Sequence, residues 1–150
     1  AMLGKEFGIQ HTYVPFKGGG TVAKNLVGNH INATVNNPAE QMGFWQAGKV
    51  RPIVAFTPER LAVFPDVPTA RELGHDIVYW MQRSFVAPKD MPADAVAYYT
   101  EMLEQLGATS EWQEYASGKA LVADMLTGDA LQNYFLNERS KHAEILASIE

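Results

Sequence analysis

Hydrophobic residues in the first half of the chain fall into short runs that are bounded by glycine, proline and asparagine, a pattern typical of β-strands. The run at residues 50–56 is nearly continuous after Arg51, which predicts a strand buried on both faces. Helix-capable segments separate the runs, and successive strand–helix–strand crossovers predict a parallel sheet. The predicted strands are residues 11–16, 31–35 and 50–56, and residues 77–79 and 84–87 are predicted to form one long extended segment with a break near residues 81–83.

The helices predicted between these strands carry start and stop signals. Asn37 is suited to be an N-cap, Pro38 to the first helical position, and Glu40 follows three residues after the cap. Residues 69–72 form a second capping box, which predicts a short helix that ends at Gly74. The helices predicted in this half are residues 3–8, 21–27, 38–48 and 69–74.

The pattern changes near Pro88, after which apolar residues recur at spacings of three and four. This periodicity predicts amphipathic helices, starting near Pro92, Ser110 and Asp129. We therefore assign the chain to the α/β class, with an α/β part at residues 3–87 and a helical part at residues 88–150. The apolar stripes of the first and last of these helices are Val96, Tyr99, Met102, Leu103 and Leu106, and Leu131, Tyr134, Phe135, Ile145, Leu146 and Ile149.

The charge balance argues against several classes of function. Seventeen acidic residues outnumber twelve Lys and Arg, and no basic run occurs, so the chain lacks the electrostatic footprint of a nucleic-acid partner. No apolar run approaches the ~20 residues that a membrane helix needs. Without cysteine the chain has no thiolate ligands, and its four histidines are not at metal-ligand spacing, so we expect no metal site. No nucleophile-elbow motif indicates catalysis.

The loop Lys17–Thr21, with three consecutive glycines, carries the candidate chemistry. It stands between a predicted strand and a predicted helix, where unpaired N–H groups and the positive end of the helix dipole converge. Such a loop favours an anion without a charged side chain. A plain strand-to-helix turn explains the glycines equally well.

A dinucleotide site is the serious rival for the same glycines. Residues 18–23, GGGTVA, fit the pattern G-x-G-x-x-[GA] between a strand and a helix. The acidic residue that should bind the ribose about 20 residues further on is missing, because that position offers Asn36 and Asn37. Lys17 precedes the glycines, whereas the lysine of a P-loop follows them.

Several motifs in order resemble one known family. Residues 14–20, VPFKGGG, resemble the VPYKGGG segment of the Bug-type (TctC-like) solute receptors of tripartite tricarboxylate transporters. Residues 64–74, FPDVPTARELG, resemble the LPDVPTxxExG motif of that family, and residues 85–88, FVAP, its F-A-P segment. The likeness covers nearly the whole chain, but only the second half of such a receptor. We therefore expect the signal peptide and the first lobe to be absent from this chain.

The resemblance implies the second lobe of a type II periplasmic-binding-protein-like fold, a parallel-rich sheet flanked by helices, with C-terminal helices that pack on the first lobe. It implies a periplasmic receptor, with no cofactor and no catalysis, that captures a small carboxylate for the membrane components of a transporter. Asn36 departs from the Asp that is common in the family, so a neutral amide replaces a charge. The ligand-binding residues implied are Phe16, Lys17, Gly18, Gly19, Gly20, Thr21, Asn36, Asn37, Tyr79, Trp80 and Met81.

Two other functions stay open at this point. One is a dinucleotide-binding domain of an oxidoreductase, and the other is a non-transport interaction module on the same fold. Because the apolar stripes of the C-terminal helices need cover, we also expect them to fold back on the chain's own sheet or to pair in a homodimer.

Overall fold

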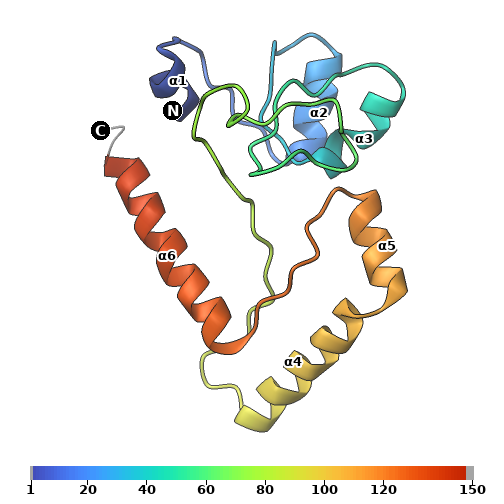
Figure 1. Ribbon diagram of the computed structural model, residues 1–150, viewed down its shortest axis with the longest axis vertical. Helices are drawn as coiled ribbons and strands as arrows, with labels where there is room; N and C mark the ends of the chain where they lie inside the picture. Colours follow the sequence, from blue (N-terminus) through green and yellow to red (C-terminus); the bar gives the residue numbers. More distant parts are fainter. Residues whose placement is uncertain (1, 148–150) are drawn as a thin grey trace. The chain divides into compact units, whose positions relative to one another are not determined.

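The computed structural model describes residues 2–147 and is rich in helix (Figure 1). Residues 148–150, which include Ile149 of the predicted C-terminal stripe, lie outside the described residues. None of the helices in the described part is long and apolar enough to cross a membrane. The helices are α1 (Met2–Phe7), α2 (Gly19–Val27), α3 (Pro38–Gln46), α4 (Ala93–Gly107), α5 (Ser110–Gly118) and α6 (Gly128–Ala147).

The helix ends follow the local signals in the sequence. α3 begins at Pro38, after Asn37 in extended conformation, and α2 ends before Gly28, as predicted. Gly8 and Gly48 adopt positive φ angles of 61° and 66° directly behind α1 and α3. The predicted helices near Pro92, Ser110 and Asp129 are also confirmed, each within two residues of its expected start. These signals act within one helical turn and need no tertiary contacts.

The three predicted strands are wrong as regular elements, because neither they nor the segment at residues 77–87 forms a strand in the described part of the chain. One isolated parallel bridge joins Ala55 and Thr69. Its hydrogen bonds run from Ala55 N–H to the Pro68 carbonyl and from Ala70 N–H to the Ala55 carbonyl, both 2.9 Å. A strand needs a paired neighbour along its length, and these segments pair only at single residues.

The short helix predicted at residues 69–74 is also wrong, although its capping box forms. Thr69 N–H donates to the Glu72 carboxylate (2.7 Å), and Glu72 N–H donates to the Thr69 hydroxyl (3.2 Å). The segment continues as turns that end at Gly74, which has a φ of 90°. The two reciprocal hydrogen bonds therefore stabilise a turn in place of a helix.

The chain divides into two compact units, residues 16–123 and residues 2–15 with 124–147. In the larger unit α2 packs against α3, and the Trp45 and Phe64 rings meet edge-on with centroids 4.8 Å apart. The division predicted at residues 87 and 88 stays a prediction. The buried residues of the larger unit are Ala23, Met42, Ala55, Phe64, Thr69, Ala70, Ile77 and Ala116.

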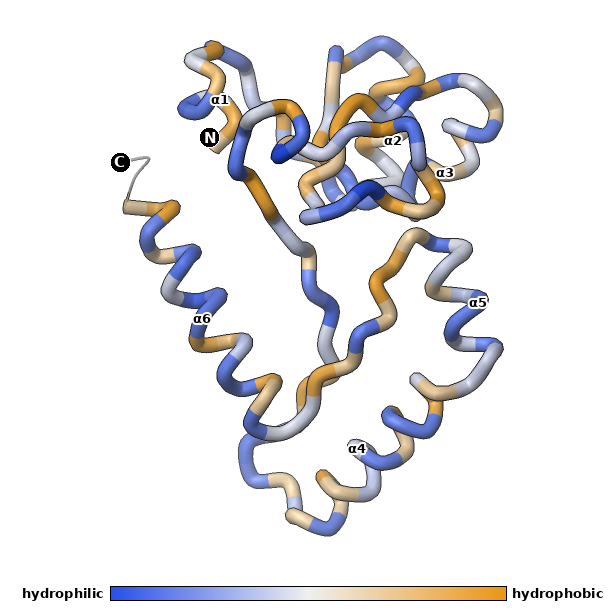
Figure 2. Tube along the Cα trace, in the orientation of Figure 1, coloured by the Kyte–Doolittle hydropathy of each residue, from blue (hydrophilic) through white to orange (hydrophobic). Residues whose placement is uncertain are grey.

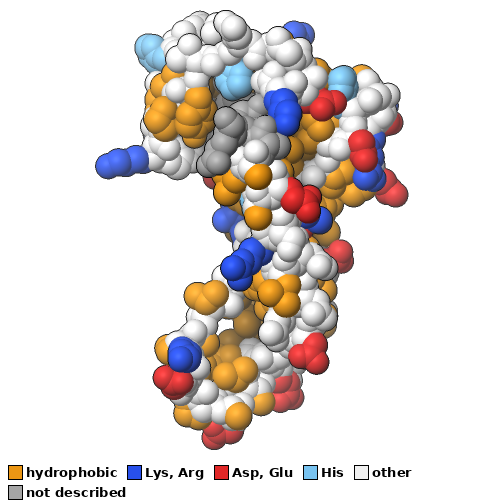
Figure 3. All heavy atoms as spheres, turned by 90° about the vertical axis from the view of Figure 1, so that its left-hand side faces the viewer, with side chains coloured by type: hydrophobic (Ala, Val, Ile, Leu, Met, Phe, Trp, Pro, Cys, Tyr) orange, Lys and Arg blue, Asp and Glu red, His pale blue; other side chains and the backbone are white. Residues whose placement is uncertain are grey.

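The apolar stripes of the long helices are open to solvent. Figure 2 shows hydrophobic and hydrophilic residues alternating along α4 and α6. Hydrophobic side chains lie on the surface among charged ones in Figure 3. On α4, the stripe residues Tyr99 and Met102 are 49% and 43% exposed. The predicted packing of these helices on a sheet of the chain is thus not formed, because no sheet exists in the described residues to receive them.

Candidate functional site

The glycine loop starts α2 and presents two backbone donors. Gly18 is the N-cap, with φ 83° and ψ 151°, and its carbonyl accepts hydrogen bonds from the N–H groups of Thr21 (3.2 Å) and Val22 (3.3 Å). The N–H groups of Gly19 and Gly20 have no hydrogen-bond acceptor in the part of the chain that the structure describes. Free N–H groups at the positive end of a helix dipole attract anions.

Two asparagines connect this loop to other predicted site residues. Asn36 Nδ2 donates to the Gly19 carbonyl at 3.2 Å, which brings the segment before α3 to the start of α2. Asn37 Nδ2 donates to the Met81 sulfur at 3.0 Å. The structure therefore groups Gly19, Asn36, Asn37 and Met81 by direct contacts. Asn37 caps α3 by its backbone conformation alone, since its side chain makes no hydrogen bond to the helix.

Glu40 makes a different contact from the one that the sequence predicted. It was expected to close a capping box with Asn37, but α3 has no side-chain cap hydrogen bond. The Glu40 carboxylate instead lies against Gly19, so that a methyl group added there would overlap it. Its Oε2 atom is enclosed and has no hydrogen-bond partner in the described structure. The sequence did not predict this contact, because the spacing of Glu40 from Asn37 indicated a capping box and no other signal indicated a contact with Gly19.

The remaining predicted site residues are less closely joined. Phe16 is half-buried and Lys17 is exposed, directly before the loop. Tyr79 N–H donates to the Phe56 carbonyl at 2.9 Å, while its side chain is 46% exposed. In the part of the chain that the structure describes, no hydrogen bond joins Phe16, Lys17 or Trp80 to Gly18–Thr21.

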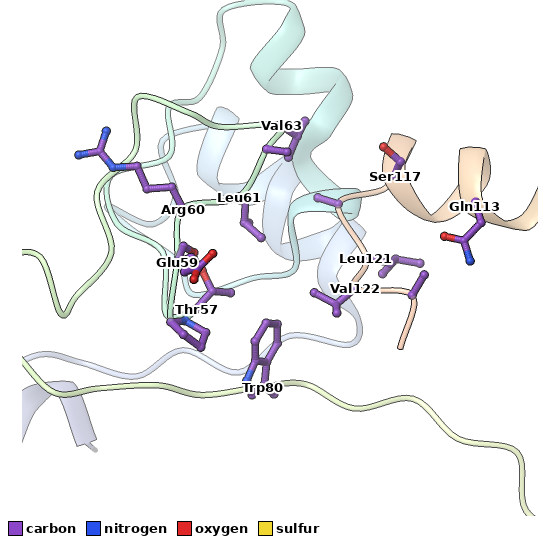
Figure 4. Close-up of a pocket in the computed structure, with 14 residues that line it drawn as sticks. Thr57, Glu59, Arg60, Leu61, Val63, Trp80, Gln113, Ser117, Leu121 and Val122 are labelled. Atoms are coloured by element: carbon purple, nitrogen blue, oxygen red, sulfur yellow. Dashed lines mark hydrogen bonds between the residues drawn. The ribbon is translucent and has the colours of Figure 1, made fainter. Parts of the chain in front are cut away.

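Trp80 borders a separate cavity of about 770 Å³. In Figure 4 its ring points toward the space between the segment at residues 57–63 and residues 121–122. The family resemblance implied a place for Trp80 in the carboxylate wall, and this role stays a prediction. In the structure Trp80 has mainly apolar neighbours in this cavity. The labelled lining residues are Thr57, Glu59, Arg60, Leu61, Val63, Trp80, Gln113, Ser117, Leu121 and Val122.

Arg60, one of the two charged residues that line this cavity, is held by a neighbouring turn. Arg60 Nε lies 3.0 Å from both oxygens of Glu72, and its Nη1 donates to the Pro65 carbonyl at 2.9 Å. The hydrogen bond from Arg60, followed by that from the Thr69 N–H, lowers the pKa of Glu72. Because its guanidinium is already paired, Arg60 fixes the segment at residues 60–72 and is poorly placed to bind a free anion.

The polar groups at the start of α2 include both hydrogen-bond donors and the Glu40 carboxylate, which lies against Gly19. Within the described residues, no three His, Cys, Asp or Glu side chains are grouped to hold a metal ion. The free N–H groups of Gly19 and Gly20 and the Asn36 amide lie at the start of α2. Backbone donors at a helix N-terminus favour an anion in general, and the Glu40 carboxylate is an anionic side chain that already lies against Gly19.

Comparison with known proteins gives the family. The model of the TctC family, described as "Tripartite tricarboxylate transporter family receptor", matches residues 1–142. The chain belongs to this family of transport receptors, so the resemblance that the motifs carried is confirmed.

Two curated relatives agree with this assignment. The "UPF0065 protein in gbd 5'region" of Cupriavidus necator is 34% identical over 87 residues, which are 58% of this chain and 26% of that protein. The "UPF0065 protein in the TAR-I ttuE-ttuC' intergenic region" of Agrobacterium vitis is 31% identical over 150 residues, 97% of this chain and 43% of that protein. The chain thus spans less than half the length of each of these relatives.

Proposed function

We propose that this chain is the ligand-binding part of an extracytoplasmic solute receptor that captures a small carboxylate for a tripartite tricarboxylate-type transporter. Membership of the receptor family supports a role in transport in place of catalysis. The chain corresponds to one lobe of a type II periplasmic-binding-protein-like fold. Its working place is the periplasm, and its partners are the membrane components of the transporter.

The observation that carries the proposal is the pair of free N–H groups at Gly19 and Gly20. A carboxylate at a helix N-terminus gains roughly 0.3–1 kcal/mol from the dipole, and charge-assisted hydrogen bonds contribute roughly 1.5–3 kcal/mol each. The space beside Gly18 is open, because a methyl group added there would meet no atom within 4 Å. A ligand therefore has room to approach the Gly19 and Gly20 N–H groups. Binding therefore depends on the main chain more than on any one side chain.

The other residues implied by the family resemblance form the rest of the proposed wall. Asn36 is anchored on the Gly19 carbonyl, and Asn37 holds Met81. These amides select neutral hydrogen-bonding parts of a ligand. Tyr79 and Trp80 lie on the same extended segment as Met81. Tyr79, whose side chain is 46% exposed, offers aromatic surface to a ligand, while Trp80 borders the separate cavity. Phe16 and Lys17 directly precede the three glycines in the chain.

Calorimetry with acetate, succinate and citrate tests this function. Lys17→Ala should weaken binding by only ~1 kcal/mol or less, because the exposed ammonium group is screened by water. Gly19→Val should weaken binding far more, because a branched side chain beside the Gly19 and Gly20 N–H groups obstructs the approach of an anion and displaces the Glu40 carboxylate that lies against Gly19. Gly43→Val is the matched control, because Gly43 lies in α3 with open space around it. The reverse order of Lys17→Ala and Gly19→Val would overturn the main-chain account.

The dinucleotide alternative receives no support from the site. Asn36 and Asn37 occupy the place of the ribose-binding acid, and Asn36 is engaged with the Gly19 carbonyl. A fluorescence titration with NAD should show no saturable binding. Micromolar affinity for NAD would reverse the ranking of the two functions.

A further inference from the structure

The side chains of Asn37 and Met81 form a direct link between segments that are 44 residues apart in the chain. Asn37 Nδ2 donates a hydrogen bond to the Met81 sulfur at 3.0 Å. Asn37 stands directly before α3, but its side chain makes no hydrogen bond to that helix. Met81 belongs to the extended segment at residues 77–87. The start of α3 is therefore joined to this segment through a thioether sulfur, which is a weak acceptor.

The Met81 sulfur is also open to reagents in solution. Met81 is 63% exposed, more than any other of the six methionines of the chain, whereas Met42 is 9% exposed. The chain has no cysteine, so its methionines carry all of its sulfur. The hydrogen bond from Asn37 leaves the sulfur a second lone pair with which to attack an oxidant. An exposed thioether of this kind is readily converted to methionine sulfoxide.

We propose that Met81 is an oxidation site and that Asn37 clamps the sulfoxide formed there. The sulfur attacks one oxygen of hydrogen peroxide and the O–O bond breaks. The proton on the transferred oxygen passes to the departing hydroxide, which leaves as water. Sulfur loses two electrons in this step and the peroxide gains them.

The sulfoxide oxygen is polar and is a stronger acceptor than the thioether that it replaces. Because the methionine side chain is unbranched and rotates easily, it can turn this oxygen toward the Asn37 amide. Oxidation therefore strengthens the link between the start of α3 and the segment at residues 77–87. This inference does not depend on the proposed function, since none of its readouts involves a ligand.

The main-chain N–H of Tyr79 reports on the strength of this link. It donates to the Phe56 carbonyl at 2.9 Å and lies on the same extended segment as Met81. Its hydrogen exchanges with solvent when the segment opens locally. We expect this exchange to become about fivefold slower after oxidation, which corresponds to about 1 kcal/mol, the size of one net hydrogen bond.

The experiment treats the whole chain with hydrogen peroxide and compares oxidised with untreated protein. Peptide mass mapping follows the sulfoxide at each methionine, and NMR follows exchange of the Tyr79 amide. The first sulfoxide should form at Met81, well before the buried Met42 reacts. Reduction by methionine sulfoxide reductases should return the Tyr79 exchange rate to that of the untreated chain.

Three variants separate the clamp from general oxidation. Met81→Leu and Asn37→Ala should lose the slower exchange, because each removes one partner of the link. Met102→Leu, which removes an exposed methionine from α4, is the matched control and should keep it. If Asn37→Ala does not fold by circular dichroism, Met81→Leu and the reductase decide. Oxidation of Met81 no faster than of Met42, exchange at Tyr79 that oxidation leaves unchanged or accelerates, or slowing that persists in Met81→Leu or after reduction would overturn the inference.

Discussion

Alanine at Gly18 should destabilise the larger unit by about 1–3 kcal/mol. The φ of 83° and ψ of 151° at Gly18 border a region of backbone space that is almost closed to residues with a Cβ atom, where the strain is of that size. A methyl group at this position meets no atom within 4 Å. The whole effect therefore comes from backbone strain at the start of α2 and not from a steric clash.

Gly20→Ala is the matched control, two residues away in the same loop. Gly20 lies inside α2 without a positive φ, and an added methyl group there also meets open space. Because alanine is favoured over glycine in a helix by roughly 0.5–1 kcal/mol, this change should stabilise the unit by up to that amount. The two substitutions add the same atoms and are expected to act in opposite directions.

Urea titration followed by far-UV circular dichroism measures both variants. The midpoint should fall for Gly18→Ala and rise for Gly20→Ala, with the slope of the transition unchanged. In thermal unfolding, each 1 kcal/mol corresponds to roughly 2–4 °C in Tm for a chain of this size. Equal shifts in both variants would refute the strained conformation of Gly18 and, with it, the geometry of the loop.

Two further predictions concern the Arg60–Glu72 pair and the exposed helices. The hydrogen bond from Arg60 lowers the folded-state pKa of Glu72, so its stabilisation is present above the unfolded-state pKa and is lost as pH falls through the lowered value. Glu72→Gln should flatten the acid limb of a plot of unfolding free energy against pH, and an unchanged limb would contradict the pairing. Because each large apolar side chain in water forgoes ~1.5–3 kcal/mol of burial, the exposed stripe of α4 should drive dimer formation, and light scattering from a monomer at tens of micromolar would disprove it.

The sequence predicted the parts of the fold that depend on neighbouring residues. Asn37 and Pro38 determine the start of α3, and Gly28 marks the end of α2, whatever the rest of the chain does. The strands could not be predicted in the same way, because a run such as residues 50–56 becomes a strand only where a partner pairs along it. In the described residues that run pairs with its neighbours at Ala55 and Phe56 alone.

The candidate site shows the same division between local and distant effects. Gly18–Thr21 alone predicted that a helix follows the glycines, and α2 begins at Gly19. The contact of Asn36 with Gly19 agrees with the predicted grouping of these two residues. The direction of Glu40 was not predictable, since its spacing from Asn37 indicated a local cap while the side chain turns to α2. The neighbours of Trp80 were not predictable for a related reason, because residues 57–63 and 121–122 approach it only in the folded chain.

The central claim is that main-chain N–H groups of the glycine loop receive a carboxylate. The most direct measurement is a ¹H–¹⁵N NMR titration of the whole chain with sodium acetate, with sodium chloride at equal ionic strength as the reference. The account predicts saturable shifts at the amides of Gly19 and Gly20, the two donors that have no acceptor in the described structure. Shifts that are confined to other residues, or that chloride reproduces in full, would contradict it.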